Sequence, residues 1–349
     1  MTTSLRIAVV GAGAIGRAHI DRILKSRGCQ LMAIVDPAPR ASDLAAKAGV
    51  PLLASLADVL KQRPDGVILA TPNRLHVEQG LACIAVGVPA LIEKPLAGTN
   101  EDGERLCEAA ERAGVKLLTG HHRQHNPIMT RAVEIVKSGR LGRLVAVVGT
   151  EMFCKPDQYF EDGPWRRQLG GGPLLINMVH EIGNLRALCG EIVAVQAFAS
   201  SATRNFPVED TVSVSLRFAN GVLGSFMLSD TVAVPRSWEQ TTREDPFFAA
   251  YPDEDCYVVA GTDGSLAIPT MRLRFYGDRA KRSWREPFEE ETIGIERADP
   301  LTRQLENFCA VIRGMAKPVV SARDGLQNVR VLDAIRRAAA SGQTCVIEK

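Results

Sequence analysis

The fold of the first part of the chain is decided by Leu5-Arg6-Ile7-Ala8-Val9-Val10-Gly11-Ala12-Gly13-Ala14-Ile15-Gly16. The apolar run 5–10 is typical of a buried strand, and a helix is predicted over 14–26. Gly11 permits a tight turn, Gly13 lets the backbone approach a pyrophosphate, and Gly16 allows close packing of helix and strand. The N–H groups near Ala14 and Ile15 then face the phosphates at the positive end of the helix dipole. The stretch predicts a dinucleotide-binding strand–turn–helix unit.

Asp36 lies about 20 residues beyond the glycines, at the end of a strand predicted over 31–35, as this motif requires. Its carboxylate can accept hydrogen bonds from both hydroxyls of an adenosine ribose, and it would repel a 2′-phosphate. Pro37 follows, where an NADP enzyme more often carries a residue that holds the phosphate, while Arg40 is the one nearby feature that favours NADP. We therefore expect NAD, with NADP second. A glycine-rich turn without a ligand is the alternative.

Short apolar runs alternate with helical patterns as far as residue 122, which indicates a parallel sheet covered by helices on both faces. Beyond residue 122 the spacing of apolar residues changes. Residues 212–218 alternate apolar and polar, Asn220-Gly221 makes a turn, and 222–228 return, which predicts a β-hairpin. We expect an α/β protein with a Rossmann domain over 1–122 and an α+β domain over 123–349. The irregular segment 231–255 is either a functional or oligomer-contact insertion or a mobile surface loop.

Composition excludes several classes of protein. The 349 residues suggest about two domains, and 42 basic against 40 acidic residues leave a net charge of +2, so no nucleic-acid footprint is expected. The eight cysteines are scattered without a CxxC pair, which favours reduced thiols and argues against zinc. The start of the chain does not resemble a signal peptide, and no apolar run reaches the ~20 residues of a membrane helix. We expect a cytoplasmic protein with no membrane partner and no metal.

Glu93-Lys94-Pro95 ends the fifth predicted strand, and ligands of open parallel sheets lie at that edge. Pro95 restrains the backbone of Lys94, so its amine can be aimed. As a general base at neutral pH, Lys94 needs a pKa lowered from ~10.4 towards 7–8, which burial and an oxidised nicotinamide would both favour. The alternative is a surface lysine whose amine reaches into solvent.

Gly170-Gly171-Gly172-Pro173 precedes a helix that Gly190 ends. The glycines would leave room for a ligand. One helix face carries Asn177 and His180 three residues apart, so His180 could donate to a substrate hydroxyl or relay its proton, with Asn177 orienting it. A structural or solvated histidine is the alternative.

Other candidates follow strand ends or precede the glycine run. His121, His122 and Arg123 follow the sixth strand, where they face a ligand or bridge the two domains. Thr71-Pro72-Asn73 and His76 lie after the fourth strand, where His76 is near the nicotinamide or caps the next helix. Trp165 and Arg166 would cover the cofactor, or Trp165 is a packed aromatic.

Together these motifs resemble the glucose–fructose oxidoreductase/inositol dehydrogenase/rhizopine-catabolism (Gfo/Idh/MocA) family. The resemblance covers nearly the whole chain, including Gly261-Thr262-Asp263-Gly264-Ser265-Leu266. It implies a second domain with a large, mostly antiparallel open sheet, and a homo-dimer or homo-tetramer formed through that sheet. The polar face Thr211, Ser213, Ser215 and Arg217 would suit such a contact.

The resemblance also implies roles for single residues. Lys94 and His180 match the family's catalytic pair. Substrate-binding roles are expected for Asn177, His122 and Arg123. The residues expected at the cofactor are Gly11, Gly13, Ala14, Ile15, Gly16, Asp36, Thr71, Pro72, Asn73, His76, Glu93, Lys94 and Arg166.

The chain departs from the family pattern at two acids. Ile176 stands where many members have an Asp four residues before the histidine, and Gly183 where many have an Asp three residues after it. A relay through His180 would lack its anionic partner.

The expected function is an NAD-dependent dehydrogenase that oxidises a ring hydroxyl of a sugar, sugar acid or cyclitol. Lys94 would take the proton while the hydride goes to nicotinamide. Two alternatives stay open: a non-catalytic NAD-binding sensor or regulator, and a redox-neutral enzyme with tightly bound NAD.

Overall fold

The structure is a computed structural model that describes residues 4–348, the side chain of Arg40 excepted, and it divides into two compact units. The first unit comprises Met1–Asn126 and Ala298–Val329, and the second comprises Pro127–Arg297 and Arg330–Lys349. The observed division differs in two ways from the predicted boundary at residue 122. The first unit continues to Asn126, and a C-terminal segment, Ala298–Val329, also belongs to it. The physical reason is burial, because α10 (Pro300–Ile312) places Leu305, Phe308 and Val311 in a core of the first unit.

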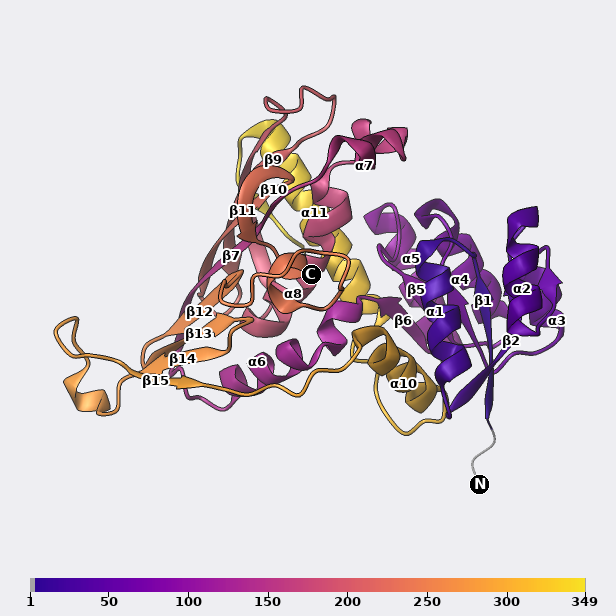
Figure 1. The fold of residues 1–349 in the computed structure, drawn as a ribbon, viewed down its shortest axis with the longest axis horizontal. Coiled ribbons are helices and arrows are strands. Elements are labelled where there is room, and N and C mark those ends of the chain that lie inside the picture. The colour runs from indigo at the N-terminus through magenta and orange to yellow at the C-terminus, as the bar shows by residue number, and fades with distance from the viewer. Residues whose placement is uncertain (1–3, 349) are drawn as a thin grey trace. The chain divides into compact units, whose positions relative to one another are not determined.

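The first unit is a doubly wound parallel sheet of order β3-β2-β1-β4-β5-β6 (Figure 1). Its strands are β1 (Leu5–Val10), β2 (Cys29–Val35), β3 (Leu52–Leu53), β4 (Gly66–Leu69), β5 (Ala90–Glu93) and β6 (Leu117–Gly120). Besides α10, its helices are α1 (Ala14–Lys25), α2 (Ser42–Ala48), α3 (Leu56–Lys61), α4 (His76–Ala85) and α5 (Asn100–Ala113). Both predictions, the parallel sheet and the helix after the glycines, are confirmed.

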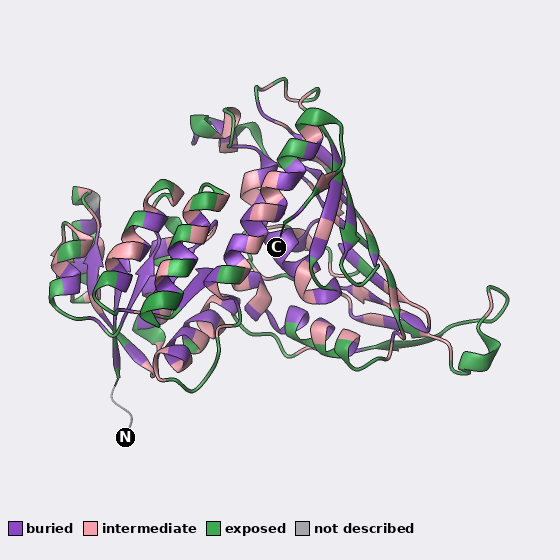
Figure 2. Ribbon diagram, turned by 180° about the vertical axis from the view of Figure 1, so that it is seen from behind, coloured by how far each residue is buried: buried purple, intermediate pink, exposed green. Residues whose placement is uncertain are grey.

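Burial explains why these strands are apolar on both faces. All four residues of β4, β5 and β6 are buried, and Figure 2 shows the inner strands buried between helices with exposed outer sides. Local capping fixes the helix ends, as in α5, where the Thr99 side chain accepts from the N–H of Asp102 and left-handed Gly114 ends the helix. The carboxyl ends of β1, β4 and β5 therefore emerge together at one edge.

The second unit is built on a ten-stranded, mostly antiparallel sheet, as predicted. Its strands are β7 (Leu144–Cys154), β8 (Ile192–Ser200), β9 (Thr211–Phe218), β10 (Leu223–Ser229), β11 (Thr231–Arg236), β12 (Tyr257–Gly261), β13 (Gly264–Ile268), β14 (Arg272–Phe275), β15 (Glu289–Thr292) and β16 (Cys345–Val346). The predicted hairpin is present, since β9 and β10 pair antiparallel with Arg217 opposite Leu223. The β7–β10 pair is parallel.

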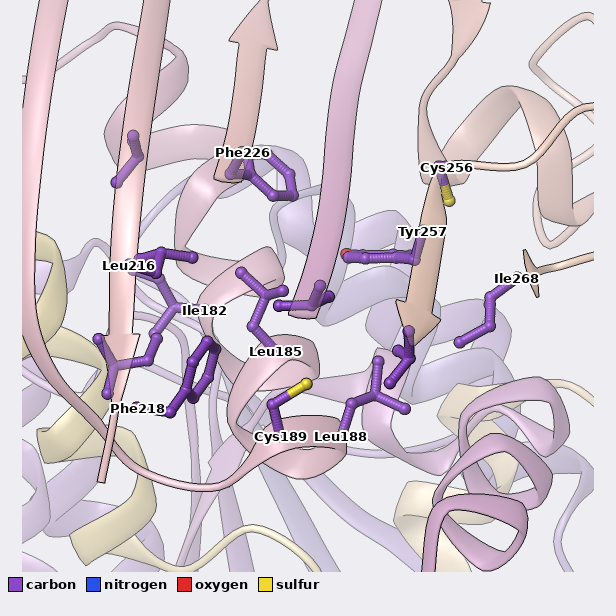
Figure 3. Packing of buried hydrophobic residues seen from close by; sticks show 14 of the residues in the cluster. Ile182, Leu185, Leu188, Cys189, Leu216, Phe218, Phe226, Cys256, Tyr257 and Ile268 are labelled. Atoms are coloured by element: carbon purple, nitrogen blue, oxygen red, sulfur yellow. The ribbon is translucent and has the colours of Figure 1, made fainter. Parts of the chain in front are cut away.

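One face of this sheet is covered by helices. They include α6 (Pro127–Lys137), α8 (Val179–Cys189) and the part of α11 (Ala322–Ser341) that belongs to the second unit. In Figure 3, Ile182, Leu185 and Leu188 of α8 point towards Phe218, Phe226 and Tyr257 of the strands, and all are buried. This core holds α8 firmly against β7, β9 and β10.

The segment 231–255 is not a structureless loop. It contains β11, which pairs with β7, and the short helix α9 (Trp238–Thr242), whose Trp238 is buried. None of the helices in residues 4–348 has the length and apolar character needed to cross a membrane.

Candidate functional site

The glycine loop joins β1 to α1 with the geometry the motif predicts. Gly11 has a φ of +98°, and a Cβ on it would overlap the Ala70 carbonyl, so no other residue fits. A Cβ on Gly16 would overlap the Gly11 carbonyl, so helix and turn touch there. Gly13, the N-cap of α1, has open space on its Cβ side. The backbone at Gly13 is thus exposed to a ligand at the N-terminus of a twelve-residue helix.

Asp36 follows β2 and is fixed against the glycine loop. Its Oδ2 accepts from the Ala12 N–H at 2.7 Å and its Oδ1 accepts from the Ala38 N–H at 2.8 Å. A carboxylate has about four acceptor positions, so both oxygens can still accept from ribose hydroxyls. The glycine loop and the carboxylate together fit a dinucleotide. The side chain of Arg40 lies outside the described residues.

The loops after β4 and β5 meet at the same edge. Thr71, Pro72 and Asn73 follow β4, and Asn73 begins a short 3-10 helix, Asn73–Leu75. His76 is the first residue of α4 and is buried, with Nε2 at 2.8 Å from the Thr71 carbonyl oxygen and Nδ1 at 2.8 Å from that of Pro95. The alternative that His76 caps α4 does not hold, because its two ring nitrogens contact carbonyl oxygens of two separate loops.

Lys94 lies directly after β5 and is half-buried, with a cis peptide bond to Pro95. Beside it the buried Glu93 carboxylate contacts His19 Nε2 of α1 at 2.8 Å and accepts from the Lys94 N–H at 3.3 Å. Burial would raise the pKa of Glu93, but the hydrogen bond to His19 and the charges of His19, His122 and Lys94 lower it below its usual value. Glu93 is therefore an ionised carboxylate beside the predicted base.

The residues after β6 form a second polar group in the first unit. His121 is buried, with Nε2 at 3.1 Å from the Asn328 amide nitrogen, and Arg123 is also buried. His122 begins the 3-10 helix His122–His125 and lies near enough to Glu93 to lower its pKa. The two predicted substrate ligands His122 and Arg123 thus belong to the unit that carries Lys94.

In the second unit, Asn177 lies in a π-helical turn, Leu174–Met178, that leads into α8, and His180 lies in the first turn of α8. Both are buried, with 6% and 7% of their surface exposed. Glu181 and Asn184, which continue the polar face of Asn177 and His180, are completely buried. The π turn inserts one residue into the helical register, and such turns occur often at functional sites.

Two of the three glycines in the run 170–172 lie close to other parts of the chain and do not have the open space that was predicted for a ligand. A Cβ on Gly171 would overlap the Trp165 carbonyl, and one on Gly172 would overlap the Glu209 carboxylate. Glu209 Oε1 instead accepts from the Leu174 N–H at 3.1 Å, at the start of the π turn. These two glycines are required by close packing of the chain.

A buried polar cluster surrounds Asn177, and the sequence reasoning missed it. Lys155 Nζ donates to Asn177 Oδ1 at 2.8 Å and lies 3.3 Å from Asp230 Oδ2. Asn177 Nδ2 donates to Glu151 Oε1 at 3.3 Å, and Glu151 Oε2 accepts from the Trp238 N–H at 3.0 Å. Burial lowers the pKa of Lys155, and the charges of Asp230 and the nearby glutamates oppose this only in part.

A signal for this cluster was present in the sequence. Alternate residues of β7 point inward, namely Val147, Gly149, Glu151 and Phe153. Because side chains alternate along a strand, this pattern places the acid Glu151 in the core. A buried acid demands a partner, and Lys155 follows two residues after Phe153. The cluster supplies carboxylates near Asn177, although the family acids are replaced by Ile176 and Gly183.

Arg166 and Trp165 lie in the 3-10 helix Pro164–Arg167. The guanidinium of Arg166 stacks on Tyr159, 3.8 Å from the ring centre, and donates to the Tyr159 carbonyl. Trp165 is 57% exposed, so it is not the packed aromatic that we considered. Nothing described places Arg166 at the cofactor, and that role stays a prediction.

Comparison with known proteins now adds to this geometry. Residues 5–121 match the family model of an oxidoreductase family with an NAD-binding Rossmann fold, GFO_IDH_MocA, and residues 129–267 match the model of the GFO/IDH/MocA C-terminal domain. The chain belongs to the Gfo/Idh/MocA family. It is an oxidoreductase, and the resemblance stated from its motifs is confirmed.

Relatives match over almost the entire chain. The chain is 31% identical to the rhizopine catabolism protein MocA of Rhizobium meliloti, over 95% of this chain and 94% of that protein. It is 28% identical to 1,5-anhydro-D-fructose reductase of Ensifer adhaerens, over 98% of both. Among solved structures, the chain is similar to the WlbA dehydrogenase from Bordetella pertussis, whose crystal structure is a complex with NADH and UDP-GlcNAcA. The two sequences are 26% identical, and the structures align with a TM-score of 0.78 over 99% of this chain and 100% of that one.

Proposed function

We propose that the protein is an NAD-dependent dehydrogenase that oxidises a ring hydroxyl of a sugar, sugar acid or cyclitol. The supporting observation is the sheet order of the first unit, in which β1, β4 and β5 are neighbours. It brings the glycine loop and Lys94 to the carboxyl edge where ligands of such sheets lie. The fixed Asp36 carboxylate supports NAD over NADP.

The residues have separate tasks in this proposal. Bound NAD supplies the hydride acceptor, carbon C4 of its nicotinamide. In its neutral form, the amine of Lys94 accepts the proton of the substrate hydroxyl as the C–H bond of the same carbon breaks. In the first unit, His122 and Arg123 are the candidates for binding and orienting the hydroxyl groups. In the second unit, His180 and Asn177 are the candidates for the same role. The Lys155 and Glu151 contacts leave one N–H of Asn177 Nδ2 for a ligand.

The proposed substrate class rests on the relatives. Their names include 1,5-anhydro-D-fructose reductase and the inositol 2-dehydrogenase of Arthrobacter, which is 31% identical over 79% of this chain and 82% of that protein. Both act on polyhydroxylated molecules, one named for reduction and the other for oxidation. Whether this chain oxidises or reduces its substrate is decided by measuring which of the two reactions it catalyses.

A dehydrogenase screen tests the proposal. The purified protein is incubated with NAD or NADP and a panel of sugars, sugar acids and inositols, and the absorbance of the reduced nicotinamide is followed. We expect turnover with NAD and at least one member, lost in Lys94→Ala and kept in the exposed-lysine control Lys116→Ala. Bound NAD without turnover across the panel contradicts the proposal and favours a sensor. Nucleotide retained through purification favours the redox-neutral alternative.

We also propose that the open face of the large sheet joins two copies of the chain. Ser213, Ser215 and Arg217 are exposed there as predicted, and the same face carries exposed Val148 and Met227. An apolar patch rimmed by polar residues is typical of a protein interface. Light scattering tests this: a dimer or tetramer is expected, and a monomeric mass contradicts it.

A further inference from the structure

Two buried histidines contact the residues on either side of Lys94. His19, from the middle of α1, has Nε2 at 2.8 Å from the Glu93 carboxylate. His76, at the start of α4, has Nδ1 at 2.8 Å from the Pro95 carbonyl oxygen. Each histidine is only 1% exposed. Because they come from two different helices, they hold the Glu93-Lys94-Pro95 turn from both sides.

We propose that His19 and His76 are positioning residues that fix Lys94 for proton transfer. This inference rests on the proposed function, in which Lys94 is the base. It assigns His76 a different task from the direct cofactor contact expected from sequence, because both of its ring nitrogens already face carbonyl oxygens.

The His19 contact acts through the Glu93 carboxylate. One carboxylate oxygen contacts His19 and the other accepts the Lys94 N–H at 3.3 Å, so the side chain ties the main chain of Lys94 to α1. A Cβ on Gly120 would lie 2.7 Å from the Glu93 carboxyl carbon, so the absence of a side chain on β6 makes room for this arrangement. Since α1 begins at the glycine loop, the same helix faces the pyrophosphate position and holds the Lys94 turn.

The His76 contact acts on the main chain directly. Its ring joins the Pro95 carbonyl to the Thr71 carbonyl, and thereby the loop after β5 to the loop after β4. A carbonyl oxygen only accepts, so a neutral imidazole donates to one of the two and a protonated imidazole donates to both. In either form the ring fills the space between the two loops and limits their movement.

The expected effect follows from the geometry that proton transfer needs. A general base must lie within hydrogen-bond reach of the proton that it removes, and a misplacement of ~1 Å can cost on the order of 100-fold in rate. Lys94 has a long, flexible side chain, so the position of its amine depends on how firmly its backbone is held. Loss of either histidine should lower turnover more than cofactor affinity.

The experiment compares His19→Leu and His76→Leu with His125→Leu, a matched control. His125 is a buried histidine of the same unit, at 5% exposure, with no described hydrogen bond to the turn. Three quantities are measured for each variant: thermal stability, NADH affinity by fluorescence, and the rate of acetic-anhydride labelling of Lys94 relative to Lys116 by peptide mass spectrometry. Labelling needs no substrate, so it reads the environment of Lys94 even if the dehydrogenase proposal fails.

We expect similar losses of stability in all three variants, but a change in relative Lys94 labelling on the order of threefold or more only in the His19 and His76 variants. With the panel member that gives the highest rate, their kcat should fall about 10- to 100-fold while NADH affinity changes little. Unchanged labelling and kcat in both, with Lys94→Ala inactive, overturns the positioning role alone. An active Lys94→Ala overturns the proposed function itself.

Two conservative variants sharpen the test at His76 and avoid a large loss of stability. The amide nitrogen of Asn lies near the place of a histidine Nδ1, and that of Gln near Nε2. His76→Asn can therefore keep the bond to Pro95, whereas His76→Gln keeps only the bond to Thr71. Higher kcat and wild-type-like labelling in His76→Asn are expected. Equal losses in both variants contradict a role through Pro95.

Discussion

Lys94 and Lys155 show how differently the two units hold a charged side chain. Lys94 lies at a strand end in a short, recognisable motif and is half-buried, and its neighbours in sequence carry the anchoring contacts. Lys155 belongs to no recognised motif, is 7% exposed, and is held by Asn177 and Asp230, which are distant in sequence. Both lysines are held by tertiary contacts, but those of Lys94 act through its neighbours in sequence, Glu93 and Pro95, whereas those of Lys155 act on its own amine. Lys94 is proposed to take a proton, and Lys155 keeps Asn177 and Asp230 in place.

The two units also differ in their content of histidine, which responds to pH, and of tryptophan, which gives a fluorescence signal. Five of the six histidines, His19, His76, His121, His122 and His125, lie in the first unit. All three tryptophans, Trp165, Trp238 and Trp284, lie in the second. Acid should therefore affect the first unit through its histidines, and tryptophan fluorescence reports mainly on the second. This separation allows each prediction below to be measured in one unit.

The largest effect is expected from Lys94→Ala. If Lys94 is the proposed general base, its removal should lower kcat by on the order of 10²–10⁴-fold, with little change in NADH affinity. Because Lys94 is only half-buried, stability should stay within about 0.5 kcal/mol of wild type. Steady-state kinetics and NADH fluorescence measure the two quantities, and Lys116→Ala is the control. Near-wild-type turnover would remove Lys94 from the mechanism and with it the contrast between the two lysines.

Lys155→Met should act on stability first. The change leaves Asp230 with Arg204 as its remaining cation, at 3.0 Å, and takes from Asn177 its donor. Breaking a buried ion pair costs roughly 3–5 kcal/mol, and the remaining contact puts this change near the lower end. Denaturant unfolding followed by the fluorescence of buried Trp238 measures the loss, with exposed Lys137→Met as control. A loss equal to that of the control would show that packing of the second unit does not depend on this amine.

The third prediction concerns acid sensitivity of the first unit. Burial, with the charges of His122 and Arg303, lowers the pKa of His125 from 6.5 to about 4. The folded state therefore binds fewer protons than the unfolded state, and stability falls as the pH drops from 6.5 to 4, by roughly 3 kcal/mol in total. Hydrogen exchange of β1 and β5 peptides at several pH values measures this. His125→Gln should flatten the dependence, and an unchanged slope in that variant contradicts the assignment to His125.

The smallest effect is expected at the ribose position. Asp36→Asn keeps an oxygen for one of the backbone N–H bonds but removes the charge that favours the ribose hydroxyls and repels a 2′-phosphate. NADH affinity should fall about 10-fold, and the preference over NADPH should narrow. Fluorescence titration with both nucleotides measures this, with Asp43→Asn as the exposed control. An unaltered ratio of the two affinities would mean that another residue selects the cofactor.

Prediction from sequence succeeded where the responsible residues are neighbours in the chain. Gly11 and Gly16 show their steric reasons within one turn, and the Asn220-Gly221 hairpin depends on adjacent residues. It missed α6, although Ile128, Ala132 and Ile135 have helical spacing, and α9, although Ser237 is a suitable N-cap. It also missed the return of 298–329 to the first unit, which no local pattern indicates. The glycine run shows the limit: a Cβ on Gly171 would overlap the Trp165 carbonyl and one on Gly172 would meet the Glu209 carboxylate, contacts that the sequence pattern does not reveal.

Local patterns along the chain account for the nucleotide fold, the order of its motifs and the place of Lys94 directly after a strand, because steric exclusion at glycine and the strand period act over a few residues. Tertiary structure decided which groups surround those motifs. His19 meets Glu93 across 74 residues, and Lys155, directly after β7, meets Asp230 in the turn between β10 and β11. Such pairs form only when the folded chain removes both groups from water, since an unpartnered buried charge is too costly to persist.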